Sequence, residues 1–264
     1  MGNTFIAVEG QHDLEFICGL LKPEGFEKVV LVERLDEIFG RRIINTRFPV
    51  EGDLHKRVSN PMFMRRESDW VAVQAAGGET PLLLSCVSKV MEGLRPFPGA
   101  LSAVGIVRDA DDSSAGDQLT ALLEEADKIR EIQGYSVNLP QNPGEIAEGS
   151  PRLGIFVFPD NSAQGTIEDL LIDCGEAVYP NLIQGARTYV NGVDRSLLNA
   201  KDRSLIDKPA GTRKAVVACA ANILKPGMSI AASIDQNRWL NETTRALPRV
   251  QALADFLKRL SGIS

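Results

Sequence analysis

The sequence predicts an α/β fold: a mostly parallel sheet with helices on both faces, followed by a mainly helical C-terminal part. Short apolar runs alternate with segments of helical periodicity, as in parallel sheets that are covered on both sides. The 264 residues, 44% hydrophobic and 24% charged, match a globular chain with a sizeable core. Since no apolar run reaches the roughly 18 residues that span a bilayer, we expect a cytoplasmic protein with no membrane segment.

Five apolar runs are the expected strands, at residues 4–8, 26–32, 70–75, 103–107 and 153–158. Amphipathic spacing predicts a helix after four of them, with Asp13 and Thr166 as the N-caps of the first and last. Residues 33–68 show no sustained period, so we expect an insertion there and no core element. We therefore predict an α/β domain at 1–175 and a helical extension packed on it at 176–264, with its clearest helices at 213–224 and 248–260.

The charge is unevenly distributed. The net charge of −6 excludes a protein whose whole surface binds nucleic acid. Residues 41–66 nevertheless carry seven bases and two acids, and residues 195–214 carry six and two, whereas residues 109–131 carry eight acids and two bases. This pattern fits a carboxylate site between basic walls, and it equally fits solvated loops. The candidate nucleic-acid contacts are Arg41, Arg42, Arg65 and Arg66.

Cysteine and histidine usage limits the choice of metal. The four cysteines are widely separated, unlike the close pairs of a zinc site, so we expect small buried side chains in a reducing compartment. With only two histidines, any metal would be held by carboxylates, which favours magnesium, manganese or calcium. The chain also lacks the G-x-x-x-x-G-K-[ST] motif of a P-loop nucleotide site.

Acidic residues follow two of the expected strands. Glu9 ends the first, and Asp109-x-Asp111 ends the fourth. The carboxyl ends of parallel strands form the usual ligand edge of such a sheet. Asp109 and Asp111 alternate along an extended chain, so both are expected to point to one side. Clustered carboxylates repel one another unless cations or bases neutralise them, and magnesium is the natural partner. Ordinary capping and loop solvation are the structural alternatives for each residue.

Five motifs resemble the Toprim-domain superfamily, and most closely its small stand-alone members related to OLD-type nucleases. They are V-E-G-x-x-D at 8–13, Gly77-Gly78, D-A-D-D at 109–112, P-D-N at 159–161 and G-x-x-E-D-L-L at 165–171. The resemblance covers residues 3–32 and 69–224, without 33–68. It implies a Toprim-like, Rossmann-like fold and metal-dependent phosphodiester chemistry on DNA or RNA, often in a homodimer.

The resemblance also implies roles for individual residues. It makes Glu9 a general acid or base and Asp109 and Asp111 ligands of Mg²⁺ or Mn²⁺. By a looser match, Glu168 and Asp169 become further metal ligands, and Lys214 a catalytic cation. Strand cleavage needs such a cation to offset charge in the transition state.

Two other functions remain open. A catalytically silent Toprim-like module that acts through a protein partner is favoured by the acidic net charge and by an aromatic content of 6%, since base stacking uses exposed aromatic rings. A receiver-type phosphoacceptor also binds magnesium with paired aspartates. It would leave Glu9 and the 165–171 motif without a role.

Overall fold

The computed structural model describes residues 2–46, 53, 60–78, 80–133 and 138–263, with the backbone alone at 127–133. Within these residues one seven-stranded sheet has the order β2-β3-β4-β1-β5-β7-β6. Its strands are β1 (Asn3–Val8), β2 (Glu27–Val29), β3 (Met62–Arg66), β4 (Asp69–Ala75), β5 (Ala103–Asp109), β6 (Ile146–Ala147) and β7 (Arg152–Phe158).

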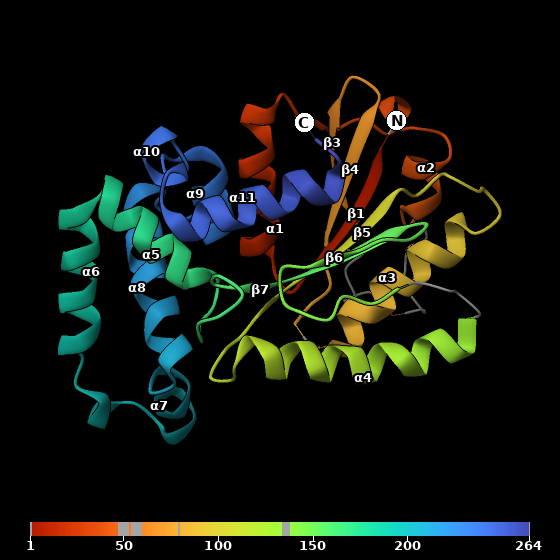
Figure 1. Ribbon diagram of the computed structural model, residues 1–264. Helices are drawn as coiled ribbons and strands as arrows, with labels where there is room; N and C mark the ends of the chain where they lie inside the picture. Colours follow the sequence, from red (N-terminus) through yellow and green to blue (C-terminus); the bar gives the residue numbers. More distant parts are fainter. Residues whose placement is uncertain (1, 47–52, 54–59, 79, 134–137, 264) are drawn as a thin grey trace.

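The four central strands, β4, β1, β5 and β7, run parallel to one another. The strands β3 and β6 pair antiparallel with β4 and β7, and β2 pairs antiparallel with β3. The predicted α/β fold with a mostly parallel sheet is therefore confirmed (Figure 1). The parallel strands place the chain segments that follow them, after Val8, Ala75, Asp109 and Phe158, at one edge of the sheet.

Alternating side chains of the sheet face two separate cores. Ile6 and Val8 of β1 belong to one core, with α1 (Gln11–Leu21), α5 (Ile167–Val178), α8 (Pro209–Leu224) and α11 (Pro248–Ser261). Phe5 and Ala7 belong to the other, with α2 (Phe39–Ile43), α3 (Thr80–Leu94) and α4 (Ala115–Gln133). Helices thus cover both faces, as the continuous apolar strands predict.

The chain beyond α5 is helical, as predicted. It contains α6 (Pro180–Gly192), α7 (Ala200–Ile206), α8, α9 (Ile230–Gln236), α10 (Glu242–Arg245) and α11, with a short 3₁₀ turn at Arg195–Leu197. Two further 3₁₀ turns, Lys22–Glu24 and Val32–Arg34, lie earlier in the chain. Trp239 is fully buried in the same core as Ile6, so these helices share a hydrophobic core with the sheet. None of the described helices has the length and apolar character needed to cross a membrane.

The expectation of an insertion without core elements at 33–68 is wrong for the described part of that stretch. Met62–Arg66 forms β3 inside the sheet, where Phe63 and Met64 are buried, and Phe39 of α2 is fully buried. Residues 47–52 and 54–59 lie outside the described part. Only two residues of β3 are buried, and two arginines follow them, so the apolar pattern is too short to predict a strand. The strand expected at 26–32 is also shorter, because β2 ends at Val29.

Candidate functional site

Four carboxyl groups gather beyond the carboxyl ends of β1 and β5, and we call them the carboxylate cluster: Glu9, Asp13, Asp109 and Glu168. Glu9 follows β1, and Asp109 is the last residue of the adjacent β5. Asp13 and Glu168 lie in the first turns of α1 and α5. Three of the four are among the few buried charged residues of the chain. The cluster therefore joins groups that are up to 159 residues apart in the sequence.

Backbone hydrogen bonds fix the positions of these carboxyl groups. In the β1–β5 register Val8 lies opposite Val107, and the backbone N–H of Asp109 donates to Glu9 Oε1 at 3.3 Å. Asp109 Oδ1 accepts a hydrogen bond of 3.0 Å from the backbone N–H of Ile167, the first residue of α5. The N-terminus of α5 is thus fastened to the end of β5, which brings Glu168 to the cluster.

The pKa values show the electrostatic cost of this arrangement. Burial raises the pKa of Glu9 to about 7, although the nearby Arg108 opposes the rise. Burial and the charge of Glu168 raise the pKa of Asp13 to about 7, against a backbone hydrogen bond from Gly10. Burial, followed by the charges of Asp13, Glu9 and Glu168, raises the pKa of Asp109 well above its usual value. Without a cation, three of the four carboxyl groups therefore hold their protons to a higher pH than free carboxyl groups do.

Glu168 differs from the other three. Burial would raise its pKa, but the hydrogen bond with His12 and the charge of Lys214 lower it below the usual value. His12 Nδ1 lies 3.2 Å from Glu168 Oε1, so α1 and α5 are joined across the site. The side chain is 1% exposed, and its second oxygen, Oε2, has no hydrogen-bond partner. A buried, ionised oxygen of this kind is a ready acceptor for a cation or a donor group.

Two cations border the cluster. Arg108 is buried, donates from Nη1 to Thr80 Oγ1 at 2.7 Å, and places Nε 3.7 Å from Glu9 Oε1. Lys214 is exposed, and its charge lowers the pKa of both Asp13 and Glu168. Lys214 is the sixth residue of α8, which begins earlier than predicted, at Pro209.

The structure contradicts the expectation that Asp109 and Asp111 point to one side of an extended chain. Asp111 has a φ of 52°, in the left-handed region, and its side chain is exposed whereas that of Asp109 is buried. The backbone of Asp111 instead pairs with Gly165 through two hydrogen bonds of 2.8 and 2.9 Å. The backbone of Asp111 therefore connects the end of β5 to the loop before α5. Its side chain is not part of the cluster, but its negative charge raises the pKa of Glu9.

Asp169 caps α5 and lies outside the cluster. Its Oδ2 accepts a hydrogen bond of 2.8 Å from the backbone N–H of Thr166 and lies 3.2 Å from Arg213 Nε. Asp13 makes the equivalent bond in α1, where the backbone N–H of Gly10 donates to Oδ2 at 2.7 Å. The N-cap of α1 is thus Gly10, and the prediction of Asp13 in that position is wrong. The sequence reasoning missed Asp13 and His12 as site residues, although V-E-G-x-x-D contained the signal for Asp13.

The described basic residues of the stretch 41–66 lie at the other end of the sheet. Arg66 lies opposite Asp69 at the start of β4, whereas the cluster lies beyond the strand ends. The guanidinium of Arg42 lies 5.1 Å from the ring centre of Phe97, which follows the C-terminus of α3. Arg41 shares α2 with Arg42, and Arg65 is the neighbour of Arg66 on β3. These four residues do not form a wall of the carboxylate site. Arg47, Lys56 and Arg57 lie outside the described part of the chain.

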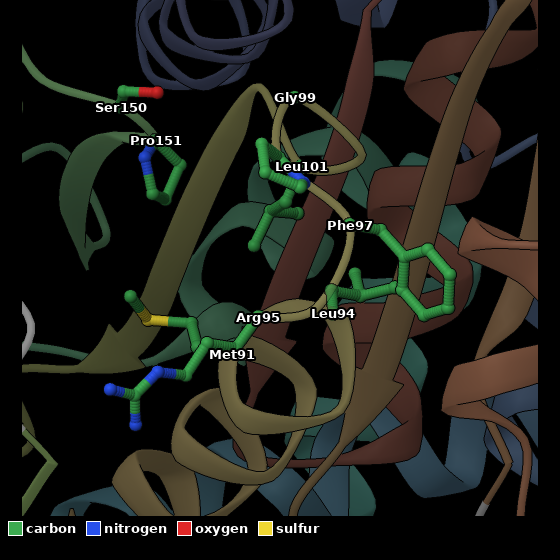
Figure 2. Close-up of a pocket in the computed structure, with 9 residues that line it drawn as sticks. Met91, Leu94, Arg95, Phe97, Gly99, Leu101, Ser150 and Pro151 are labelled. Carbon is green, nitrogen blue, oxygen red and sulfur yellow. The ribbon is translucent and has the colours of Figure 1, made fainter.

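That far end also holds a pocket of about 220 Å³ (Figure 2). Met91, Leu94 and Arg95 of α3 line it together with Pro151, which precedes β7. No candidate site residue contributes to its lining. The pocket is therefore separate from the carboxylate cluster.

The cluster fits a divalent cation in its chemistry, but it is not a finished metal cage. All four groups offer oxygen atoms, the ligands that hard cations prefer. Glu168 Oε2 has no hydrogen-bond partner and is free to bind a cation. Among the described residues, no three His, Cys, Asp or Glu side chains already stand in positions that could hold a metal ion. The arrangement suits a cation held by one or two carboxylates together with water and phosphate oxygens, as Mg²⁺ commonly is.

Comparison with known proteins identifies a family and a fold. A family model described as "Protein of unknown function (DUF3226)" matches residues 3–262, including the stretch 33–68. No curated protein matches the chain. The crystal structure of hypothetical protein PH0156 from Pyrococcus horikoshii OT3 is similar, with a TM-score of 0.55 and 16% sequence identity over 98% of this chain and 95% of that one. At this identity the similarity shows the fold alone.

Proposed function

Because the chain belongs to the DUF3226 family of proteins of unknown function, we propose its activity from the site itself: hydrolysis of phosphodiester bonds in nucleic acid, with Mg²⁺ or Mn²⁺, in the cytoplasm. The observation that carries this proposal is the carboxylate cluster at the carboxyl edge of the sheet. The proposal agrees with the Toprim-like motifs, which place Glu9 and Asp109 in the same roles.

The roles of the residues follow from their surroundings. Asp109 and Glu168 are the proposed cation ligands, because Asp109 is bound to the first residue of α5, the charge of Glu168 acts on Asp109, and Glu168 Oε2 has no hydrogen-bond partner. A bound Mg²⁺ would polarise a phosphate oxygen and lower the pKa of a water molecule. Asp13 adds negative charge beside these ligands, which favours a cation there. Asp111 and Asp169 are left out of the ligand set, because the first points elsewhere and the second caps α5.

Glu9 is the proposed general acid or base. A carboxyl group whose pKa is about 7 holds or releases a proton near neutral pH, as proton transfer to a leaving oxygen requires. Arg108 lies beside Glu9 Oε1, and the charge of Lys214 acts on Asp13 and Glu168. Both cations are placed to offset the charge that develops on phosphate oxygens during cleavage.

Calorimetry tests the proposal directly. We expect Mn²⁺ and Mg²⁺ to bind the wild type, and we expect Asp109→Asn to weaken that binding by about tenfold or more, since even the loss of a group that only orients a ligand commonly costs that much. Asp255→Asn is the matched control, since this aspartate is exposed on α11, a helix that contributes no residue to the cluster. Labelled single-stranded and duplex DNA and RNA, incubated with each protein and Mg²⁺, then report cleavage. Folded wild type that binds neither cation would refute the proposal.

A second function is favoured by one observation, the lack of a preformed three-ligand group among the described residues. In that case the chain is a silent module that acts through a protein partner. Cation binding without cleavage of any of the four nucleic acids, together with a partner that binds the Glu9→Ala variant unchanged, would support the silent module over the hydrolase.

A further inference from the structure

We infer that nucleic acid reaches the carboxylate cluster along residues 195–214, and not along residues 41–66. We call residues 195–214 the basic arm; it comprises the turn Arg195–Leu197, α7 and the first turns of α8. The proposed ligand is the phosphodiester backbone, the part that DNA and RNA share. This inference rests on the proposed function and names the surface that holds its substrate.

The basic arm ends at the cluster. Arg213 pairs with Asp169, which caps the helix that carries Glu168. The charge of Lys214, the next residue, lowers the pKa values of Asp13 and Glu168. Figure 1 shows α7 at the outer end of α8, from which α8 runs back into the body of the molecule. A strand bound along the arm would therefore be led to the carboxyl groups.

The arginines of the basic arm make ion pairs and hydrogen bonds within the protein. Arg195 pairs with Asp207. Arg203 donates from Nε to the carbonyl of Arg195 at 3.1 Å and from Nη2 to the carbonyl of Leu198 at 3.3 Å. With Arg213 held by Asp169, these guanidinium groups are bound within the protein.

The lysines of the arm are free. Lys201, Lys208 and Lys214 are all exposed, and none forms an ion pair with another described residue. Along the axis of α8, Lys208 and Lys214 are about 9 Å apart at the usual rise per residue, so that neighbouring phosphates of one strand can reach both. Lysine ammonium groups on flexible stems bind phosphates as point charges, independent of base sequence. The arm thus presents Lys201 and Lys208, which the proposed reaction does not use, in line with Lys214 beside the site, on a chain with a net charge of −6.

The guanidinium groups of 41–66 are engaged differently. Arg65 lies 5.3 Å from the ring centre of Trp70, and Arg66 lies 5.2 Å from that of Phe26 and pairs with Asp69. These side chains cover aromatic rings at the end of the sheet that is remote from the cluster. They stabilise that end and are not placed to guide a strand to the carboxyl groups.

The experiment compares two double charge reversals. Lys201→Glu/Lys208→Glu changes the arm, and Arg41→Glu/Lys89→Glu makes the same change in charge on exposed residues of α2 and α3. Binding of labelled single-stranded DNA, single-stranded RNA, duplex DNA and duplex RNA is measured by fluorescence polarisation with EDTA present, so that no cation or cleavage contributes. Circular dichroism and thermal melting check that each variant is folded.

We expect the arm variant to bind at least about tenfold more weakly than the control variant at low salt. Its slope of log affinity against log salt should also be smaller by about 1.4, which corresponds to two lost phosphate contacts on a single strand. Equal affinity of the two variants, or no binding of any probe by the wild type, overturns the inference. The order of affinities among the four probes distinguishes DNA from RNA.

The same preparations separate this inference from the proposed function. Calorimetry with Mn²⁺ should give the same affinity for the arm variant and the wild type, because neither lysine touches the cluster. Cation binding with equal nucleic-acid affinity in both variants overturns the arm alone. Loss of nucleic-acid binding in the arm variant, with no cation binding by the wild type, overturns the hydrolase and supports the arm as a binding surface.

Discussion

Glu9 shows how a single side chain acquires an unusual proton affinity from its position in the fold. It lies just past a strand whose last five residues are buried, with one oxygen held by the backbone N–H of Asp109. Burial is the largest contribution to its raised pKa, and Arg108 only partly compensates for it. The same position makes Glu9 a useful proton carrier and a source of instability at high pH.

Glu9→Gln should therefore stabilise the cation-free protein in a pH-dependent way. The pKa of Glu9 is about 7 in the folded state and near 4.5 when unfolded, so the folded wild type loses stability as pH rises from about 4.5 through 7. Glutamine cannot ionise and avoids this loss. We expect the variant to gain about 1–3 kcal/mol over the wild type at pH 8, measured by urea denaturation in EDTA.

The gain should shrink toward pH 5, where Glu9 is protonated in the folded wild type. Glu124→Gln is the control, since Glu124 is exposed on α4 and should show no such pH-dependent gain. A gain for Glu9→Gln that is equal at pH 5 and pH 8 would contradict burial of an ionisable group as its cause.

Asp109 contributes a hydrogen bond as well as a charge. Its Oδ1 accepts the bond from the backbone N–H of Ile167, which Asp109→Asn can keep and Asp109→Ala cannot. We expect the alanine variant to be about 1–2 kcal/mol less stable than the asparagine variant, because a buried N–H loses its partner. Thermal melting of the two variants at one pH measures the difference. Equal stability would mean that Ile167 finds another acceptor.

From the residue pattern alone, site residues could be predicted only where the sequence marks a strand end, whereas Glu168 and Lys214 were expected from the family resemblance. Glu9 and Asp109 follow long apolar runs, so their meeting followed from the parallel sheet. Asp111 could not be placed, because a single positive φ turned its side chain away. His12 could not be recognised either, since its partner Glu168 is 156 residues away. A contact of that kind depends on tertiary packing and leaves no local pattern.

At the scale of elements, β5 and α11 approach one another unusually closely. A Cβ atom on Gly105 would lie 2.6 Å from Leu260 Cδ2 and 3.3 Å from Ile6 Cγ1. Glycine in the middle of a central strand is unfavourable by itself. Here it creates the room in which the last turn of α11 packs against the sheet.

Gly105→Ala should therefore destabilise the protein by about 1–3 kcal/mol, because the extra methyl group overpacks this contact. Gly185→Ala is the opposite case: it lies inside α6 with open space around it, and alanine is the better helix former there. We expect it to gain about 0.5–1 kcal/mol. Chemical denaturation of both variants measures the two changes, and a neutral Gly105→Ala would show that α11 can shift.

The elements that the sequence predicted well are those whose apolar pattern is long. The strands β1, β4, β5 and β7 and the helices α3, α8 and α11 were found to within a few residues. By contrast, β3 has five residues, two of them buried, and β2 has none that is fully buried. Their place in the sheet is decided by pairing with β4, and pairing partners are not visible in the sequence of one strand.

At the scale of the whole molecule, the two parts of the chain share one core. Val216, Trp239 and Leu253 belong to the same cluster of buried side chains as Ile6 and Phe156. Removal of the C-terminal helices would expose that face of the sheet to water. The boundary predicted near residue 175 thus separates an α/β part from a helical part of the chain, and both parts contribute to one continuous core.

Residues 1–175 alone should therefore fail to fold cooperatively. We expect a broad thermal transition and strong binding of a hydrophobic dye, because the face that carries Ile6 and Val8 loses α8 and α11. The full chain should show a single sharp transition by circular dichroism and by tryptophan fluorescence. A sharp transition in the fragment would establish the sheet as an independent domain.

The position of α11 also has a consequence for how the chain folds. Residues near its end pack against β1, near the beginning, and Arg152 donates from Nη2 to the carbonyl of Leu260 at 2.9 Å. Contacts between such distant segments form slowly, because a long loop must close before they contribute. During synthesis, the part of the apolar face of β1 and β5 that α11 covers therefore stays exposed until α11, which ends about 150 residues after β5, has been made. For that interval the nascent chain is a natural client for chaperones.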